Sequence, residues 1–153
     1  MTIGRIILSL VAVFTGIGAY VADWNATHIY NPNWPPHAKF HNAQTMVLAS
    51  VSAAVSLWLL LGRSEARGRL FRLDMASLFA SLYWVCLLPG IFFPGTAFYD
   101  ADLGGYHRMP SIGGFELNQA YGAVFFLILI GIANRLERRR LRRTTRDNSA
   151  AGS

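Results

Sequence analysis

The sequence contains a single cysteine and few charged residues. Cys86 is the only thiol in 153 residues, which excludes an internal disulfide and any paired-thiol mechanism, such as that of the four-helix quinone-linked thiol oxidases. Charged residues make up 14% of the chain, whereas 53% of it is hydrophobic. Ordinary soluble domains carry more charge than this. The scarcity of charge therefore points to a protein of the lipid bilayer.

The hydrophobic residues are gathered into four runs that polar or basic segments separate. The middles of these runs hold almost no ionisable residues, which argues against a transporter, because its substrate or proton path needs such groups within the membrane. We predict an all-α integral membrane four-helix bundle over residues 1–134, followed by a basic, partly disordered tail at 135–153. Helices are expected at about 4–22, 36–61, 73–93 and 115–134.

Positive charge is concentrated in two places. Four arginines lie between Arg63 and Arg72, and most of the others follow the fourth apolar run. Charge in such positions sets the topology of membrane helices and meets anionic headgroups, so we expect no nucleic-acid partner. By the positive-inside rule both regions are cytoplasmic. Four crossings then place both termini inside and both polar loops on the outer face, in the inner (plasma) membrane of a bacterium.

The first polar loop and the start of the second helix hold three of the four histidines. His37 and His41 are four residues apart, so both project from one helical face. Neutral imidazoles at this spacing can bind a divalent metal, with His28, His107 or a carboxylate as a further ligand. The same spacing also occurs in interfacial helices that bind no metal. A divalent metal on His37 and His41 is the one cofactor that the sequence suggests.

The second polar loop supplies further chemistry on the same predicted face. Histidine titrates near neutrality, and burial can tune a glutamate, so His37, His41 and Glu116 could move protons on a lipophilic substrate. Asp23 and His107 are the supporting candidates. Glu116 fits equally well as a favourable charge at the positive end of the fourth helix. Asp23 either ends the first helix or orients one of the histidines.

Residues around these groups are candidates to bind the substrate. Trp34 also fits an interfacial aromatic belt. The candidates are Trp34, Tyr99, Asn118 and Gln119. The expected partners are the bilayer and a small lipophilic molecule, and a homo-oligomer stays open. The competing class is a non-catalytic ligand-binding or accessory membrane subunit.

The segment NPNWPPHAKFHN, from Asn31 to Asn42, resembles the signature of a family of small four-helix membrane proteins from bacteria and fungi, known mainly as a domain of unknown function. The resemblance covers most of the chain and implies the four-helix fold. The architecture is more loosely similar to the emopamil-binding and sterol-isomerase superfamily, in which helices surround a lipid-accessible cavity. In this chain, however, the acidic residues are expected near the helix ends.

Overall fold

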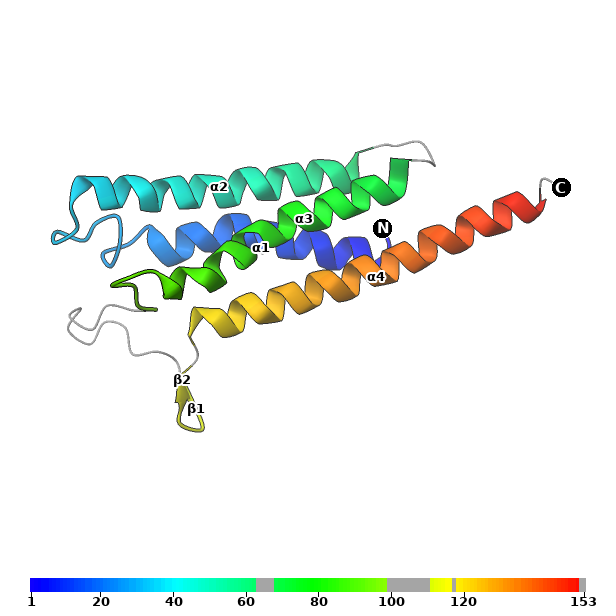
Figure 1. Ribbon diagram of the computed structural model, residues 1–153. Helices are drawn as coiled ribbons and strands as arrows, with labels where there is room; N and C mark the ends of the chain where they lie inside the picture. The colour runs from blue at the N-terminus through cyan, green and yellow to red at the C-terminus, as the bar shows by residue number, and fades with distance from the viewer. Residues whose placement is uncertain (63–67, 99–110, 117, 152–153) are drawn as a thin grey trace.

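Four long helices make up most of the protein (Figure 1). The computed structural model describes residues 1–62, 68–98, 111–116 and 118–151. The four helices are α1 (Ile3–Asp23), α2 (Pro36–Leu61), α3 (Arg69–Leu87) and α4 (Gln119–Ala151). Each is long and apolar enough to cross a membrane, α3 together with the short helix that follows it. The prediction of an all-α chain with four such helices is confirmed.

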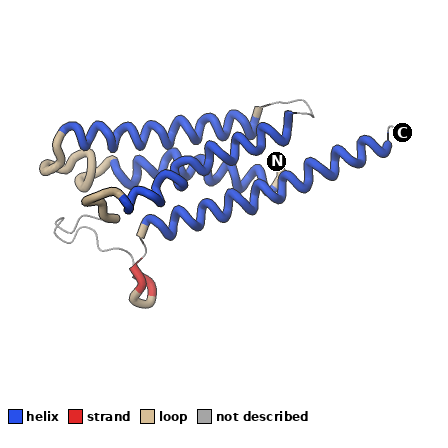
Figure 2. Tube along the Cα trace, in the orientation of Figure 1, coloured by secondary structure: helices blue, strands red, loops and turns tan. Residues whose placement is uncertain are grey.

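The helices pack as a four-membered ring. α1 lies against α2 and α4, and α3 lies against the same two neighbours (Figure 2). Small side chains fill much of the space between them, because helices in lipid associate through close packing. A Cβ atom built on Gly4 would lie 2.7 Å from the carbonyl oxygen of Ala133, so α1 and α4 require glycine at this contact.

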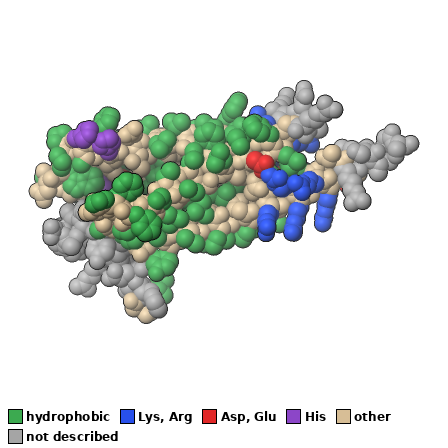
Figure 3. Space-filling view, in the orientation of Figure 1, with side chains coloured by type: hydrophobic (Ala, Val, Ile, Leu, Met, Phe, Trp, Pro, Cys, Tyr) green, Lys and Arg blue, Asp and Glu red, His purple; other side chains and the backbone are tan. Residues whose placement is uncertain are grey.

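Large hydrophobic side chains are spread along the outside of the helices, the reverse of a soluble bundle (Figure 3). Large hydrophobic side chains such as Leu10, Ile17, Trp58 and Ile128 are exposed. In water such continuous apolar exposure would cause aggregation or mark a binding surface. Over four membrane-length helices it matches the hydrocarbon of a bilayer.

One polar contact lies in the centre of the bundle. Thr15 of α1 is 2% exposed. Its hydroxyl donates to the carbonyl of Val11 at 2.8 Å and accepts from the Nε1–H of Trp84 at 2.9 Å. The Trp84 ring stacks on Phe126 of α4 with centroids 4.5 Å apart. This contact joins three helices and satisfies both polar groups, which would be costly to leave unpaired in lipid.

Two helix boundaries differ from the expected ones near the third helix. α3 begins at Arg69, four residues before the expected position, because arginine and leucine favour a helix and extend it to Gly68. α3 ends at Leu87, and the 3-10 helix η2 (Leu88–Phe92) follows. Pro89 lies in the first turn of η2, where its missing N–H costs least.

The fourth helix also begins and ends later than expected. β1 (Ser111–Ile112) and β2 (Phe115–Glu116) pair as an antiparallel hairpin in the segment where the helix was expected to start. Gly113 and Gly114 turn this hairpin with φ values of 59° and 85°, which side chains disfavour at both positions. α4 then continues through the arginine-rich segment to Ala151, beyond the expected end of the transmembrane helix at residue 134. Arginine, leucine and glutamate are all good helix formers.

The described arginines and histidines lie at opposite ends of the bundle (Figure 3). The N-terminus, the start of α3 and the basic half of α4 lie toward one end, and the α1–α2 connection lies at the other (Figure 1). We call these the basic end and the histidine end. Which end faces the cytoplasm stays a prediction.

Candidate functional site

A histidine pair occupies the first turns of α2. Pro35 precedes the helix in an extended conformation and Pro36 is its first residue, a position that suits proline because its N–H would have no helical partner. The Nε2 atoms of His37 and His41 then lie 3.0 Å apart. The two rings are nearly perpendicular, with centroids 4.5 Å apart. One helical turn is therefore sufficient to bring both imidazoles into contact.

Gln44 continues the pair by one turn. Its Oε1 atom lies 3.2 Å from Nδ1 of His41. An amide oxygen can only accept, so with the Gln44 amide in this orientation Nδ1 of His41 carries the proton, and its Nε2 is an acceptor when the ring is neutral. His37 then donates from its own Nε2. The Nδ1 of His37 is consequently an acceptor in the neutral pair, with no protein donor among the residues that the structure describes.

The histidine pair faces away from the bundle core. His37, His41 and Gln44 are all exposed, while Asn42, Met46 and Ala49 turn toward α1 or the core. The exposed side of α2 carries an apolar stripe that continues from the pair along the helix. It consists of Phe40, Val47, Leu48 and Val51. The pair therefore stands at the end of a lipid-facing surface.

A second polar cluster lies beside α1 at the same end. The Nδ2 of Asn42 donates to one carboxylate oxygen of Asp23 at 2.8 Å, and Nε2 of His28 lies 3.8 Å from the other. The rings of His28 and Trp34 also meet in a T-shaped arrangement, with centroids 5.0 Å apart. Asp23 thus contacts His28 and Asn42. Neither His37 nor His41 has a hydrogen bond or ion pair with it in the described part of the chain.

The α1–α2 connection has an internal framework of its own. Asn25 Oδ1 accepts from the backbone N–H of Thr27 at 2.8 Å and from its hydroxyl at 2.6 Å. The Thr27 hydroxyl lies 2.6 Å from Nδ1 of His28. Asn31 is 2% exposed and donates to the Thr27 carbonyl at 3.0 Å. The asparagines therefore close the turns that present His28.

The remaining predicted site residues come from the second polar loop and from the start of α4. His107 and Tyr99 lie outside the described residues. Glu116 lies in β2. Asn118 Oδ1 accepts from the backbone N–H of Ala120 at 3.0 Å and so caps the start of α4. Gln119 donates from Nε2 to the carbonyl of Phe98 at 3.3 Å. These two side chains hold the start of α4 in place.

A metal site requires several donor side chains that converge on one point. Within residues 1–62, 68–98, 111–116 and 118–151, no group of three or more His, Cys, Asp or Glu side chains is gathered around a common point. His37 and His41 could supply two nitrogen ligands from one turn. His28 instead contacts Asp23, Thr27 and Trp34. A metal on the pair would complete its shell with solvent, a lipid or residues outside the described part.

The basic end contains a buried acid that the sequence analysis passed over. Glu137 of α4 is 2% exposed. Its carboxylate accepts from the hydroxyl of Thr2 and from Nη1 of Arg140 at 3.0 Å, and Nε of Arg5 lies 3.8 Å away. Beside it, Asp74 of α3 pairs with Arg138. These contacts join the N-terminal residues to α4, and α3 to α4.

Comparison with known proteins gives one result. The model of a family of unknown function (DUF6640) matches residues 7–148. No curated protein and no solved structure matches the chain, so the likeness to the emopamil-binding and sterol-isomerase superfamily gains no support. Because the family model covers nearly all of the sequence, the chain belongs to this DUF6640 family of unknown function.

Proposed function

We propose that this membrane protein is an enzyme that moves a proton on a small lipophilic substrate at the His37–His41 pair. The observation that carries the proposal is the 3.0 Å contact between the two Nε2 atoms, with Gln44 behind His41. This order of hydrogen bonds leaves Nδ1 of His37 as an acceptor directed at whatever binds next to the pair. His37 is therefore the proposed base, and His41 and Gln44 position it.

The hydrogen-bonded pair also accounts for the charge that proton transfer creates. When His37 takes a proton at Nδ1, its imidazolium still donates from Nε2 to the neutral Nε2 of His41. Hydrogen bonds from charged donors are stronger than neutral ones, so this contact favours the protonated intermediate. If the same proton returns to another atom of the substrate, the product is an isomer and no second reactant is required.

The substrate class follows from the surroundings of the pair. Phe40 lies beside His37, with ring centroids 6.2 Å apart, and the exposed apolar stripe of α2 begins there. An amphiphile dissolved in the bilayer can lie along this stripe with its polar end at the histidines. Such a molecule would reach the pair laterally from the membrane. Asp23 and His28, in their own cluster, are proposed to support the loop.

A non-catalytic ligand-binding or accessory role is the second candidate. The observation in its favour is the exposure of both histidines, because catalytic sites usually exclude water. The same pair could hold the polar group of a ligand, or a divalent metal with two imidazole ligands, without reaction. The two candidates differ in whether a bound molecule leaves chemically changed.

The test compares the lipid-soluble molecules of membranes that contain the wild-type protein, His37→Gln, His41→Gln or His28→Gln. For the enzyme we expect one compound to fall and an isomer of equal mass to rise in wild type and His28→Gln, but not in His37→Gln. A compound that co-purifies unchanged with wild type and is lost from His37→Gln would instead support binding. Identical profiles for all four proteins would exclude the histidine pair from either role.

Two further measurements examine the pair directly. The ¹⁵N spectrum of histidine-labelled protein should show His41 as the Nδ1–H tautomer and His37 as the Nε2–H tautomer at high pH. The opposite tautomers would contradict the proposed base. Equal metal content in wild type and in the double variant His37→Gln, His41→Gln would exclude both residues as metal ligands.

A further inference from the structure

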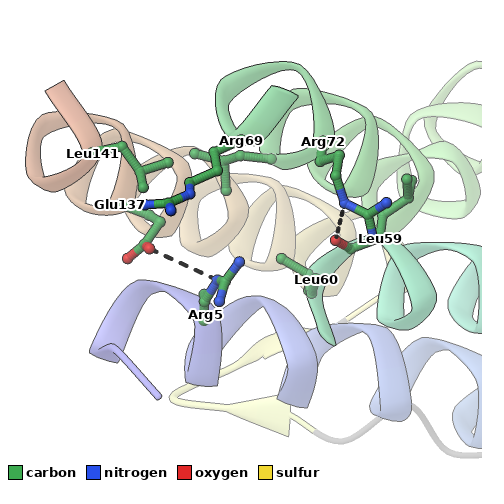
Figure 4. Close-up of a pocket in the computed structure, with 8 residues that line it drawn as sticks. Arg5, Leu59, Leu60, Arg69, Arg72, Glu137 and Leu141 are labelled. Atoms are coloured by element: carbon green, nitrogen blue, oxygen red, sulfur yellow. Dashed lines mark hydrogen bonds and ion pairs between the residues drawn. The ribbon is translucent and has the colours of Figure 1, made fainter. Parts of the chain in front are cut away.

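A hollow lies at the basic end, between the end of α2, the start of α3 and the sides of α1 and α4 (Figure 4). Its empty volume, including the open mouth, is about 250 Å³. Arg5, Arg69 and Arg72 line it together with Glu137. Leucine side chains of α2, α3 and α4, among them Leu60 and Leu141, form the rest of the wall.

The three arginines differ in how many of their N–H groups already have a hydrogen-bond partner. Arg72 donates from Nη2 to the carbonyl of Trp58 at 2.9 Å and from Nε to that of Leu59 at 3.2 Å, and it lies 5.2 Å from the Trp58 ring centroid. These contacts fix its guanidinium at the C-terminus of α2. A Cβ atom on Gly62 would overlap this guanidinium. Arg72 is therefore held in place, and its remaining N–H groups have no partner among the described residues.

Arg5 and Arg69 have more donors available. Arg5 reaches Glu137 through Nε at 3.8 Å, and its terminal nitrogens have no partner among the residues that the structure describes. Arg69 is exposed and has neither a hydrogen bond nor an ion pair within the part of the chain that the structure describes. Glu137, the one carboxylate among the described residues of the wall, is also paired with Arg140. Counted over its described residues, the hollow thus has excess positive charge and N–H donors without partners on two helices.

We propose that this hollow binds the phosphate group of an anionic lipid headgroup. Guanidinium groups bind phosphate through paired N–H donors, and arginines of α1 and α3 can contact different oxygens of one phosphate. The leucine part of the wall suits the first carbons below a headgroup. The hollow also lies where membrane-length helices end, at the depth of lipid phosphates. This proposal is independent of the histidine pair, at the opposite end.

The experiment uses Arg69→Gln, because Arg69 makes no hydrogen bond or ion pair with the described residues that the substitution could break. The matched control is Arg139→Gln, which removes the same charge from an exposed site on α4 outside the hollow. Purified full-length protein is titrated with palmitoyl-oleoyl phosphatidylglycerol at fixed ionic strength, and binding is followed by native mass spectrometry. Phosphatidylcholine with the same chains and inorganic phosphate are the comparison probes.

We expect Arg69→Gln to weaken phosphatidylglycerol binding about fivefold, the scale of one partly exposed charge-assisted hydrogen bond. Arg139→Gln should change it by less than about twofold. Displacement of the lipid by millimolar inorganic phosphate would support recognition of the phosphate itself and point to a soluble source. Retention against phosphate would point to the lipid. Equal effects of the two substitutions, or equal wild-type affinity for phosphatidylcholine, would overturn the proposal.

Discussion

The two ends of the bundle hold their polar residues in opposite ways. At the basic end, Glu137 contacts Thr2, and Asp74 contacts Arg138, so each contact joins segments far apart in the sequence. At the histidine end, His37 contacts His41 within one turn of the same helix. Glu137 is buried, whereas both histidines are exposed. The basic end therefore uses polar groups to fix the helices, and the histidine end presents them.

This difference has an energetic consequence. A buried carboxylate that loses its partners has no water to replace them, so its contacts must persist while the bundle is folded. An exposed pair can exchange its partners with water or with a ligand at little cost. Polar groups that stabilise the fold are thus expected at one end and polar groups available for chemistry at the other.

The largest expected loss of stability comes from removing the Glu137 carboxylate at the basic end. Glu137→Ala removes the acceptor shared by Thr2, Arg5 and Arg140 and leaves a gap in a buried position. We expect the free energy of unfolding to fall by about 2–3 kcal/mol. Denaturant titration of the purified protein in mixed micelles measures it.

The matched control for this substitution is Asp147→Ala, which removes an exposed acid farther along the same helix. It should change the unfolding free energy by less than about 0.5 kcal/mol. If Glu137→Ala were no more harmful than this control, the buried carboxylate would not fix the helices and the two ends would not differ as described.

The four helices could be predicted from the sequence because membrane crossing depends on local apolar runs. Glu137 was harder to interpret, since it stands within the segment RLERRR and looks like part of a solvated basic tail. A signal was nevertheless present. Ile130, Ala133, Glu137 and Leu141 are spaced as one buried face of a helix that continues past the apolar run. Extending the helical periodicity into the tail would have placed Glu137 inside.

In the candidate site, some contacts follow from spacing along the sequence, whereas others depend on packing between helices. Contact between His37 and His41 follows from their spacing alone, because one turn separates them. The direction in which the pair points depends on packing against α1, where Asn42 meets Asp23. The hairpin of β1 and β2, by contrast, is local, and its two consecutive glycines with positive φ are a turn signal present in the sequence. Contacts between distant segments cannot be read from one helix or loop considered separately.

A smaller effect is expected from the contact that links α2 to α1 at the histidine end. Asn42→Ala removes the hydrogen bond to Asp23 and should lower the unfolding free energy by about 1 kcal/mol. Asn42→Asp should cost more, because it sets two carboxylates against each other. The exposed neighbour Gln44→Ala serves as the control, with no measurable change expected. A loss as large as that of Glu137→Ala would mean that both ends fix the helices equally.

The smallest expected change in stability belongs to the histidine pair itself. The double variant His37→Gln, His41→Gln alters two exposed side chains whose contact is confined to one helical turn, so the unfolding free energy should change by less than about 0.5 kcal/mol. The same variant should lose the proposed conversion of the lipophilic substrate. Stability and conversion are measured on one preparation. A loss of about 2 kcal/mol would make the pair structural, because groups that present chemistry at a surface contribute little to holding the helices together.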